Sequence, residues 1–102
     1  MKTPTDCNSL SDVRYAIDHI DEQMVALLGL RADYVRIAAR FKSSESEVAA
    51  PDRQAAMLEV RREWAIREKL DPDFIEKWYR DLVGYFIRRE MEHYPSESGR
   101  PT

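Results

Sequence analysis

The sequence predicts an all-α protein whose first helix is much longer than the two that follow it. Apolar residues recur at the three- and four-residue spacing of a helix, and no segment shows the alternation of a strand. Only 3 of the 102 residues are glycine and 34% are charged, which suits helices with wide solvated faces. Hydrophobic residues make up 43%, enough for one folded domain, which we place at residues 1–94.

The first helix is expected to begin after Ser9, which has capping-box spacing with Asp12, and to continue to about Phe41 or Lys42. Roughly 30 residues correspond to about 45 Å at 1.5 Å per residue. The apolar stripe comprises Leu10, Val13, Ile17, Ile20, Met24, Leu27, Tyr34, Ala38 and Phe41. This helix is too long for one compact monomer, whose radius of gyration would be about 13 Å. We therefore expect a homodimer in which each long helix spans both halves.

Residues 42–50 are polar or small and are expected to form a loop. Pro51 suits the first turn of a second helix, which we expect to continue to about Lys69. Two faces of this helix remain candidates for its buried side. They are Ala55, Leu58, Arg62 and Ala65 or, alternatively, Met57, Arg61 and Trp64.

Asp71 and Pro72 are typical of the N-cap and first position of a third helix. Its apolar residues are Ile75, Trp78, Tyr79, Leu82, Val83, Phe86 and Ile87. The helix is expected to fade near Tyr94, because Pro95 cannot continue it. Residues 95–102 are then expected to be a disordered tail.

The composition excludes several classes of function. A net charge of −3 argues against nucleic-acid binding, which needs a basic surface. No apolar run approaches the ~18 residues that cross a membrane, and no signal-peptide core is present, so we expect a cytoplasmic protein. Cys7 is the only cysteine and is expected to be inert. His19 and His93 lack metal-ligand spacing, and no phosphate loop or nucleophile motif occurs, so we expect neither metal nor cofactor.

Arg31 lies in the apolar stripe, at the step after Leu27. A guanidinium cannot be neutralised, so its burial is costly unless an anion meets it. That anion is either a protein carboxylate, for which Glu90 is a candidate, or a carboxylate of a ligand. Glu90 follows Phe86 on the inner side of the third helix, where it is either solvated or faces the same cavity in its protonated form.

Three further basic residues have both a functional and a simpler interpretation. Arg14 either binds a ligand or pairs with Asp18 at i+4; Lys42 either binds a ligand or caps the helix; and Arg53 is either a ligand contact or a solvated first-turn charge. Arg14 and Arg31 lie about 25 Å apart along one helix, but they can approach each other across an antiparallel dimer. Lys42 would lie about 16 Å beyond Arg31 on nearly the same face.

Two arginines on a long helix, a lysine before a loop, an arginine after it and a late Gln or Glu form the skeleton of the all-helical chorismate mutase family. The chain resembles this family over about residues 4–92, and within it most resembles the isochorismate-pyruvate lyases of salicylate and siderophore biosynthesis. The matching segments are Met1–Cys7, Ala16–Asp21, Asp33–Val35, Arg40–Glu45 and Ala50–Leu58.

The resemblance implies a three-helix protomer in an intertwined homodimer with two sites shared between the chains. Arg14 of one chain and Arg31, Lys42 and Arg53 of the other would bind the two carboxylates and the ether oxygen of the substrate. Isochorismate loses pyruvate to give salicylate by a pericyclic hydrogen transfer, and chorismate rearranges to prephenate by a related step. Neither reaction needs a nucleophile, metal or cofactor; it needs a fixed conformer and a charge opposite the breaking bond.

Two positions depart from the lyase pattern or bear on it. Glu90 stands where the compared lyases have Gln and some mutases have Glu; a carboxylate there would repel the dianion, so Glu90 should act protonated. Gln54 stands where many mutases bind a substrate hydroxyl through Glu, which mildly favours the lyase. We also expect the loop after Lys42 to close over substrate. The leading hypothesis is a lyase with weaker mutase activity; the alternatives are a dedicated chorismate mutase and a non-catalytic helical dimer that acts as a binding module.

Overall fold

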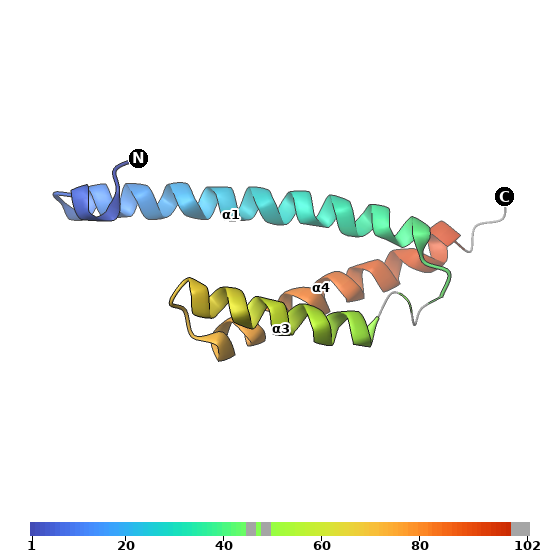
Figure 1. Cartoon of the computed structure of the whole chain (residues 1–102). Helices are drawn as coiled ribbons and strands as arrows, with labels where there is room; N and C mark the ends of the chain where they lie inside the picture. Colours follow the sequence, from blue (N-terminus) through green and yellow to red (C-terminus); the bar gives the residue numbers. More distant parts are fainter. Residues whose placement is uncertain (45–46, 48–49, 99–102) are drawn as a thin grey trace. The chain divides into compact units, whose positions relative to one another are not determined.

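The computed structural model describes residues 1–44, 47 and 50–98, and over these residues it is helical without strands. Within these residues lie the α-helices α1 (Leu10–Ala38), α3 (Pro51–Arg67) and α4 (Pro72–Ser98); the 3₁₀ turn η1 (Pro4–Asp6) precedes α1, and the 3₁₀ turn η2 (Ala39–Phe41) follows it (Figure 1). This confirms the predicted fold class with its long first helix. The chain divides into two units, Met1–Tyr34 and Val35–Thr102.

Helix α1 is continuous over 29 residues, so it is about 43 Å long at 1.5 Å per residue. Its start is capped much as predicted: the Asp12 N–H donates to the Ser9 hydroxyl at 3.1 Å. In a capping box the carboxylate would accept from the N–H of the N-cap residue, Ser9. Here the Asp12 carboxylate accepts instead from the N–H of Asn8, at 2.9 Å. The backbone bond from Asn8, together with the ammonium of Lys2, lowers the pKa of Asp12 below its ordinary value.

The end of α1 corrects the predicted position of Lys42. The α-helix stops at Ala38, and η2 tightens the last turn, with the Lys42 N–H donating to the Ala39 carbonyl at 3.3 Å. Lys42 itself has extended backbone angles (φ −100°, ψ 134°). The helical extrapolation from Arg31 to Lys42 is therefore wrong, because Lys42 lies outside the helix whose periodicity was extended to it.

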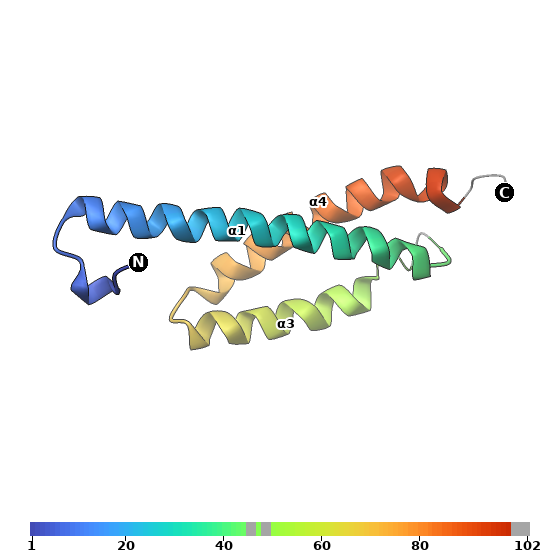
Figure 2. The ribbon, with the colours of Figure 1, turned by 90° about the horizontal axis from the view of Figure 1, so that it is seen from above.

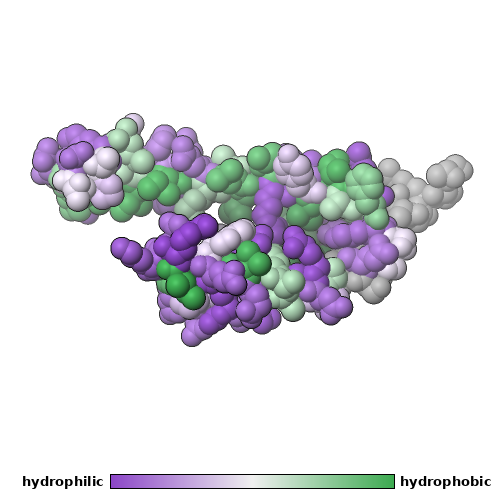
Figure 3. Space-filling model, viewed as in Figure 1, coloured by the Kyte–Doolittle hydropathy of each residue, from purple (hydrophilic) through white to green (hydrophobic). Residues whose placement is uncertain are grey.

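The chain buries no residue of α1. Its apolar stripe is exposed along the helix, from Leu10 and Val13 through Ile17, Ile20 and Met24 to Leu27. Figure 3 shows hydrophobic side chains running along this helix at the surface. Among the described residues, nothing lies within 4 Å of the position that a Cβ on Gly29 would take. The longest helix thus presents an apolar surface that the single chain leaves exposed.

In the second unit, α3 and α4 lie side by side and run in opposite directions (Figures 1 and 2). Met57 and Leu58 from α3 and Val83 from α4 form the buried core, against which Tyr79 and Ile87 pack. Both predicted faces of α3 therefore contribute, since Leu58 belongs to one and Met57 to the other.

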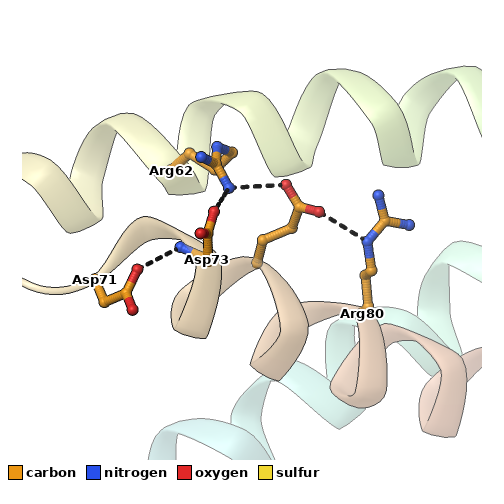
Figure 4. Close-up of polar contacts among 5 residues, drawn as sticks. Arg62, Asp71, Asp73 and Arg80 are labelled. Atoms are coloured by element: carbon orange, nitrogen blue, oxygen red, sulfur yellow. Dashed lines mark hydrogen bonds and ion pairs between the residues drawn. The ribbon is translucent and has the colours of Figure 1, made fainter.

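Two basic residues of α3, Arg61 and Arg62, contact α4. Arg61 stacks on Trp64 and Tyr79, with its guanidinium carbon 4.5 Å and 5.6 Å from the ring centroids. The next residue, Arg62, donates from Nη1 to Asp73 at 2.9 Å and to Glu76 at 3.2 Å (Figure 4). These carboxylates raise the pKa of Arg62.

Arg80 donates to the second Glu76 oxygen at 3.1 Å and extends this network along α4 (Figure 4). Asp71 caps α4 as predicted, accepting the Asp73 N–H at 2.9 Å ahead of Pro72. The other end of α4 differs from the prediction, because the helix passes Pro95 and ends at Ser98. Proline removes only its own N–H from the hydrogen-bond ladder, and the backbone continues for about one more turn. Residues 99–102 of the predicted tail lie outside the described part of the chain, and the domain boundary at residue 94 stays a prediction.

Over the described residues, none of the helices is long and apolar enough to cross a membrane.

The turn from α3 to α4 generates a stability prediction at Lys69. The N–H of Leu70 donates to the Ala65 carbonyl at 2.8 Å, and that of Lys69 to the Ile66 carbonyl at 3.1 Å, which is the Schellman pattern. Lys69 therefore has the left-handed φ of 62°, where glycine is favoured. We expect Lys69→Gly to raise the free energy of unfolding by about 0.5–1 kcal/mol. Urea unfolding at fixed protein concentration checks this, and Lys69→Ala, which keeps the Cβ, should give no gain.

Candidate active site

The central feature of the candidate site is an ion pair between Lys42 and Glu90. The Lys42 ammonium lies 2.9 Å from one carboxylate oxygen of Glu90 and 3.3 Å from the other, and the two residues are 48 positions apart. The Glu90 side chain is only 4% exposed, whereas that of Lys42 is 25% exposed. The pair therefore joins the segment that follows α1 to the far half of α4, and it has one buried and one accessible partner.

Glu90 is buried because it continues the inner face of α4. Val83 and Ile87 precede it at steps of three or four residues; Val83 lies in the core and Ile87 packs against it. A carboxylate at such a position loses its water, and this costs several kcal/mol unless a cation replaces the hydration. Lys42 supplies that cation. Both carboxylate oxygens of Glu90 thus accept from the Lys42 ammonium.

Lys42 keeps the capacity to bind a second anion. An ammonium has three N–H donors, and the two oxygens of Glu90 occupy at most two of them. The exposed quarter of the side chain gives a ligand access to the remaining donor. The arrangement therefore provides a positive charge, fixed from behind by a protein carboxylate, at the surface of the second unit.

The segment after Lys42 is held by Glu47. Its carboxylate accepts from the Ser43 N–H at 2.8 Å and from the Ser43 hydroxyl at 2.9 Å. These bonds, with a smaller contribution from the charge of Lys42, lower the pKa of Glu47. Residues 45, 46, 48 and 49 of the predicted loop lie outside the described residues, so closure of this loop over a substrate stays a prediction.

Arg53 and Gln54 lie together in the first turn of α3. The helix begins at Pro51 as predicted, and the Gln54 N–H donates to the Ala50 carbonyl at 3.0 Å. Arg53 is exposed and Gln54 half-buried. A cation near a helix N-terminus is disfavoured by the helix dipole, so Arg53 gains little from its own helix. Its position suits contact with an anion from outside.

Arg14 and Arg31 lie on α1 in the first unit. Arg14 is exposed and forms no hydrogen bond or ion pair with another described residue, so the structure does not show the alternative pairing with Asp18. Arg31 is half-buried, although its stripe neighbours Leu27 and Tyr34 are 63% and 69% exposed.

The structure brings together two pairs of the predicted residues, Lys42 with Glu90 and Arg53 with Gln54. Pairing of Lys42 with Glu90 was not foreseen, since the sequence offered Glu90 as a partner of Arg31. No local pattern links positions 48 apart, so short-range reasoning had no signal for it. The role of Glu47 could have been found, because Ser44 and Glu47 have the spacing of a capping box, and the Glu47 N–H does lie 3.3 Å from the Ser44 hydroxyl.

A long amphipathic helix, two shorter helices and a partly exposed lysine on a buried carboxylate define a small helical domain equipped for an anionic ligand. The family model for chorismate mutase type II matches residues 13–91, and the chain belongs to this family. An isochorismate pyruvate lyase of Pseudomonas aeruginosa is 43% identical over 99 residues, which cover 97% of this chain and 98% of that protein. The T-protein of Haemophilus influenzae is 31% identical over 91 residues, 88% of this chain but 22% of that protein.

The ion pair predicts an asymmetric effect on stability. Lys42→Ala leaves a buried carboxylate without its cation and should lower the free energy of unfolding by about 2–3 kcal/mol at neutral pH. Adding Glu90→Gln removes the stranded charge and should restore most of that loss. Urea unfolding of the two single variants and the double variant measures the coupling. Equal losses for Lys42→Ala with and without Glu90→Gln would show that the pair contributes nothing.

Proposed function

We propose that this protein is an isochorismate-pyruvate lyase that forms salicylate and pyruvate, with weaker chorismate mutase activity at the same site. The observation that carries the proposal is the 43% identity to a lyase over almost the full length of both chains. The structure supports it by presenting Lys42 as a fixed, accessible charge. A dedicated chorismate mutase is the second candidate, and the glutamate at position 90 favours it. A non-catalytic dimer is the third.

In the proposed reaction the protein supplies position and charge. Arginine forks hold the two substrate carboxylates in fixed geometry, and we assign this role to Arg14, Arg31 and Arg53. Lys42 donates to the ether oxygen, where negative charge develops as the C–O bond breaks. In the same step the ring hydrogen beside that bond moves to the enolpyruvyl methylene, which yields pyruvate and an aromatic ring. We assign the contact with a substrate hydroxyl to Gln54. No covalent bond forms between the protein and the substrate in this mechanism.

We further propose that the active form is a homodimer with two sites, each completed by Arg14 of the other protomer. The exposed stripe of α1 supports this, because an amphipathic helix is stable when its apolar face is covered. Arg14 supports it as well, since it is a cation without a partner among the described residues of its own chain.

The Lys42 charge is tested by activity. Lys42→Ala should lower kcat/KM for isochorismate by about 10²–10³, because one preorganised donor to the developing charge is lost. Salicylate fluorescence reports the lyase reaction, and loss of chorismate absorbance reports the mutase reaction. The double variant with Glu90→Gln separates catalysis from folding, and Lys77→Ala is the matched control because Lys77 forms an exposed pair with Asp81 on α4. Full turnover in Lys42→Ala would refute charge stabilisation; no turnover of either substrate by wild type would favour the non-catalytic dimer.

Glu90 should make the activity depend on pH. Its carboxylate holds Lys42. A dianionic substrate on Lys42 would bring added negative charge to this carboxylate, and a proton on Glu90 would relieve the repulsion. We therefore expect kcat/KM to fall as the pH rises from about 5 to 8, and Glu90→Gln to flatten the profile and keep activity at high pH. A wild-type profile as flat as that of Glu90→Gln would contradict this role.

The dimer is tested on the stripe of α1. Ile20→Lys places a charge in the stripe, whereas Val25→Lys places it on a different, more exposed face (45% against 69% exposed). If the protein were a monomer, neither substitution should change its oligomeric state or its activity much. In the proposed dimer, Ile20→Lys should dissociate the protein and abolish activity, while Val25→Lys should do neither. Analytical ultracentrifugation at several concentrations gives the answer, and a monomeric, active wild type would exclude shared sites.

A further inference from the structure

The first eight residues fold back onto the start of α1. The Thr3 hydroxyl donates to the Asp6 carboxylate at 2.5 Å, and the Asp6 N–H donates to the Thr3 carbonyl at 3.0 Å. This closes the turn η1 and directs Lys2 towards the helix. The Lys2 ammonium then lies 2.9 Å from the Asp12 carboxylate, ten positions away. An ion pair therefore joins these first eight residues, the leader, to the first turn of α1. We call this pair, Lys2 and Asp12, the leader clip.

Asp12 is the junction of this arrangement. One of its oxygens accepts both the Lys2 ammonium and the Asn8 N–H, each at 2.9 Å. Its own N–H donates to the Ser9 hydroxyl, and the Val13 N–H donates to the Ser9 carbonyl at 3.3 Å. The leader, the N-cap and the first turn thus meet at one side chain.

Arg14 follows this junction by two residues. The first turn of a helix is where amides lack helical partners and fraying begins. A long side chain magnifies any movement of its backbone, so fraying at residues 10–13 would displace the Arg14 guanidinium. Arg14 has no bond of its own to a described residue that would hold it in place. Its position therefore depends on the backbone that Asp12 secures.

We propose that Lys2 and Asp12 are positioning residues for Arg14, and that the leader clip sets how well the substrate carboxylate is bound. The inference rests on the proposed function, in which Arg14 binds a substrate carboxylate. Such a contact exists before and during the reaction, so its loss raises KM more than it lowers kcat. Neither residue of the clip touches the substrate.

The expected effects are moderate and graded. Lys2→Ala removes an exposed ion pair and should raise KM about two- to fivefold. Asp12→Ala also removes the acceptor of the Asn8 N–H and should raise KM about five- to tenfold. In both variants kcat should stay within about twofold of wild type, while Lys2→Arg, which keeps the cation, should retain the wild-type KM. Lys77→Ala, which breaks an exposed ion pair on α4, is the control for a nonspecific loss of charge.

The decisive experiment combines each change with Arg14→Ala and follows amide hydrogen exchange in the first turn of α1. If the clip acts through Arg14, Lys2→Ala and Asp12→Ala should raise KM in wild type and have no further effect once Arg14 is alanine. The amides of Val13 and Arg14 should exchange faster in Lys2→Ala. Additive effects in the Arg14→Ala background, or unchanged KM or unchanged exchange in Lys2→Ala, would overturn the clip. An Arg14→Ala variant with wild-type KM and kcat would instead refute the role of Arg14 in the proposed function.

Discussion

The buried carboxylate of Glu90 requires a cation at contact distance, and the conformation of the second unit supplies one. An ionised carboxylate without water needs a cation at contact distance, and Lys42 provides it from outside the helix to which Glu90 belongs. To do so the chain must leave α1 at Ala38, tighten into η2 and extend at Lys42. The conformation of η2 and Lys42, after α1, thus allows the ion pair with Glu90 on α4. The same requirement orients the charge that we assign to catalysis.

Charged contacts hold α4 at two distant points. Arg62 bridges Asp73 and Glu76 near the beginning of α4, and the Lys42 pair lies at Glu90, about 21 Å further along at 1.5 Å per residue. Between them the core is small, with Met57, Leu58 and Val83 as its buried centre. A core of this size provides limited stiffness by itself. Arg62 limits how far α4 can slide along α3, while Lys42 holds Glu90 from the segment that precedes α3.

Local chemistry made most of the fold predictable, and distance along the chain set the limit. The caps at Ser9 and Asp71, the proline at position 51 and the apolar spacing of each helix are all short-range signals, and the structure has these features. The ends of helices were less certain, because a 3₁₀ turn follows α1 and α4 passes Pro95. In the site, residue types were suggested by spacing and resemblance, but the pairing of Lys42 with Glu90 depends on tertiary packing. No periodic pattern encodes a contact between segments so far apart.

In the proposed reaction the protein contributes mainly the position of its cations. The residues that fix the backbone beside each cation therefore matter as much as the cation itself. Two of the proposed substrate-binding residues have a serine–carboxylate anchor beside them: Ser9 and Asp12 precede Arg14, and Ser43 bonds Glu47 after Lys42. In each anchor a carboxylate accepts a backbone N–H, and this bond lowers the pKa of the carboxyl group. Such a carboxylate fixes the main chain while the neighbouring cation remains able to meet a ligand. In this proposal Asp12 and Glu47 fix the backbone, while Arg14 and Lys42 bind the substrate. This division explains how exposed segments of the chain can still hold cations in position for a dianion.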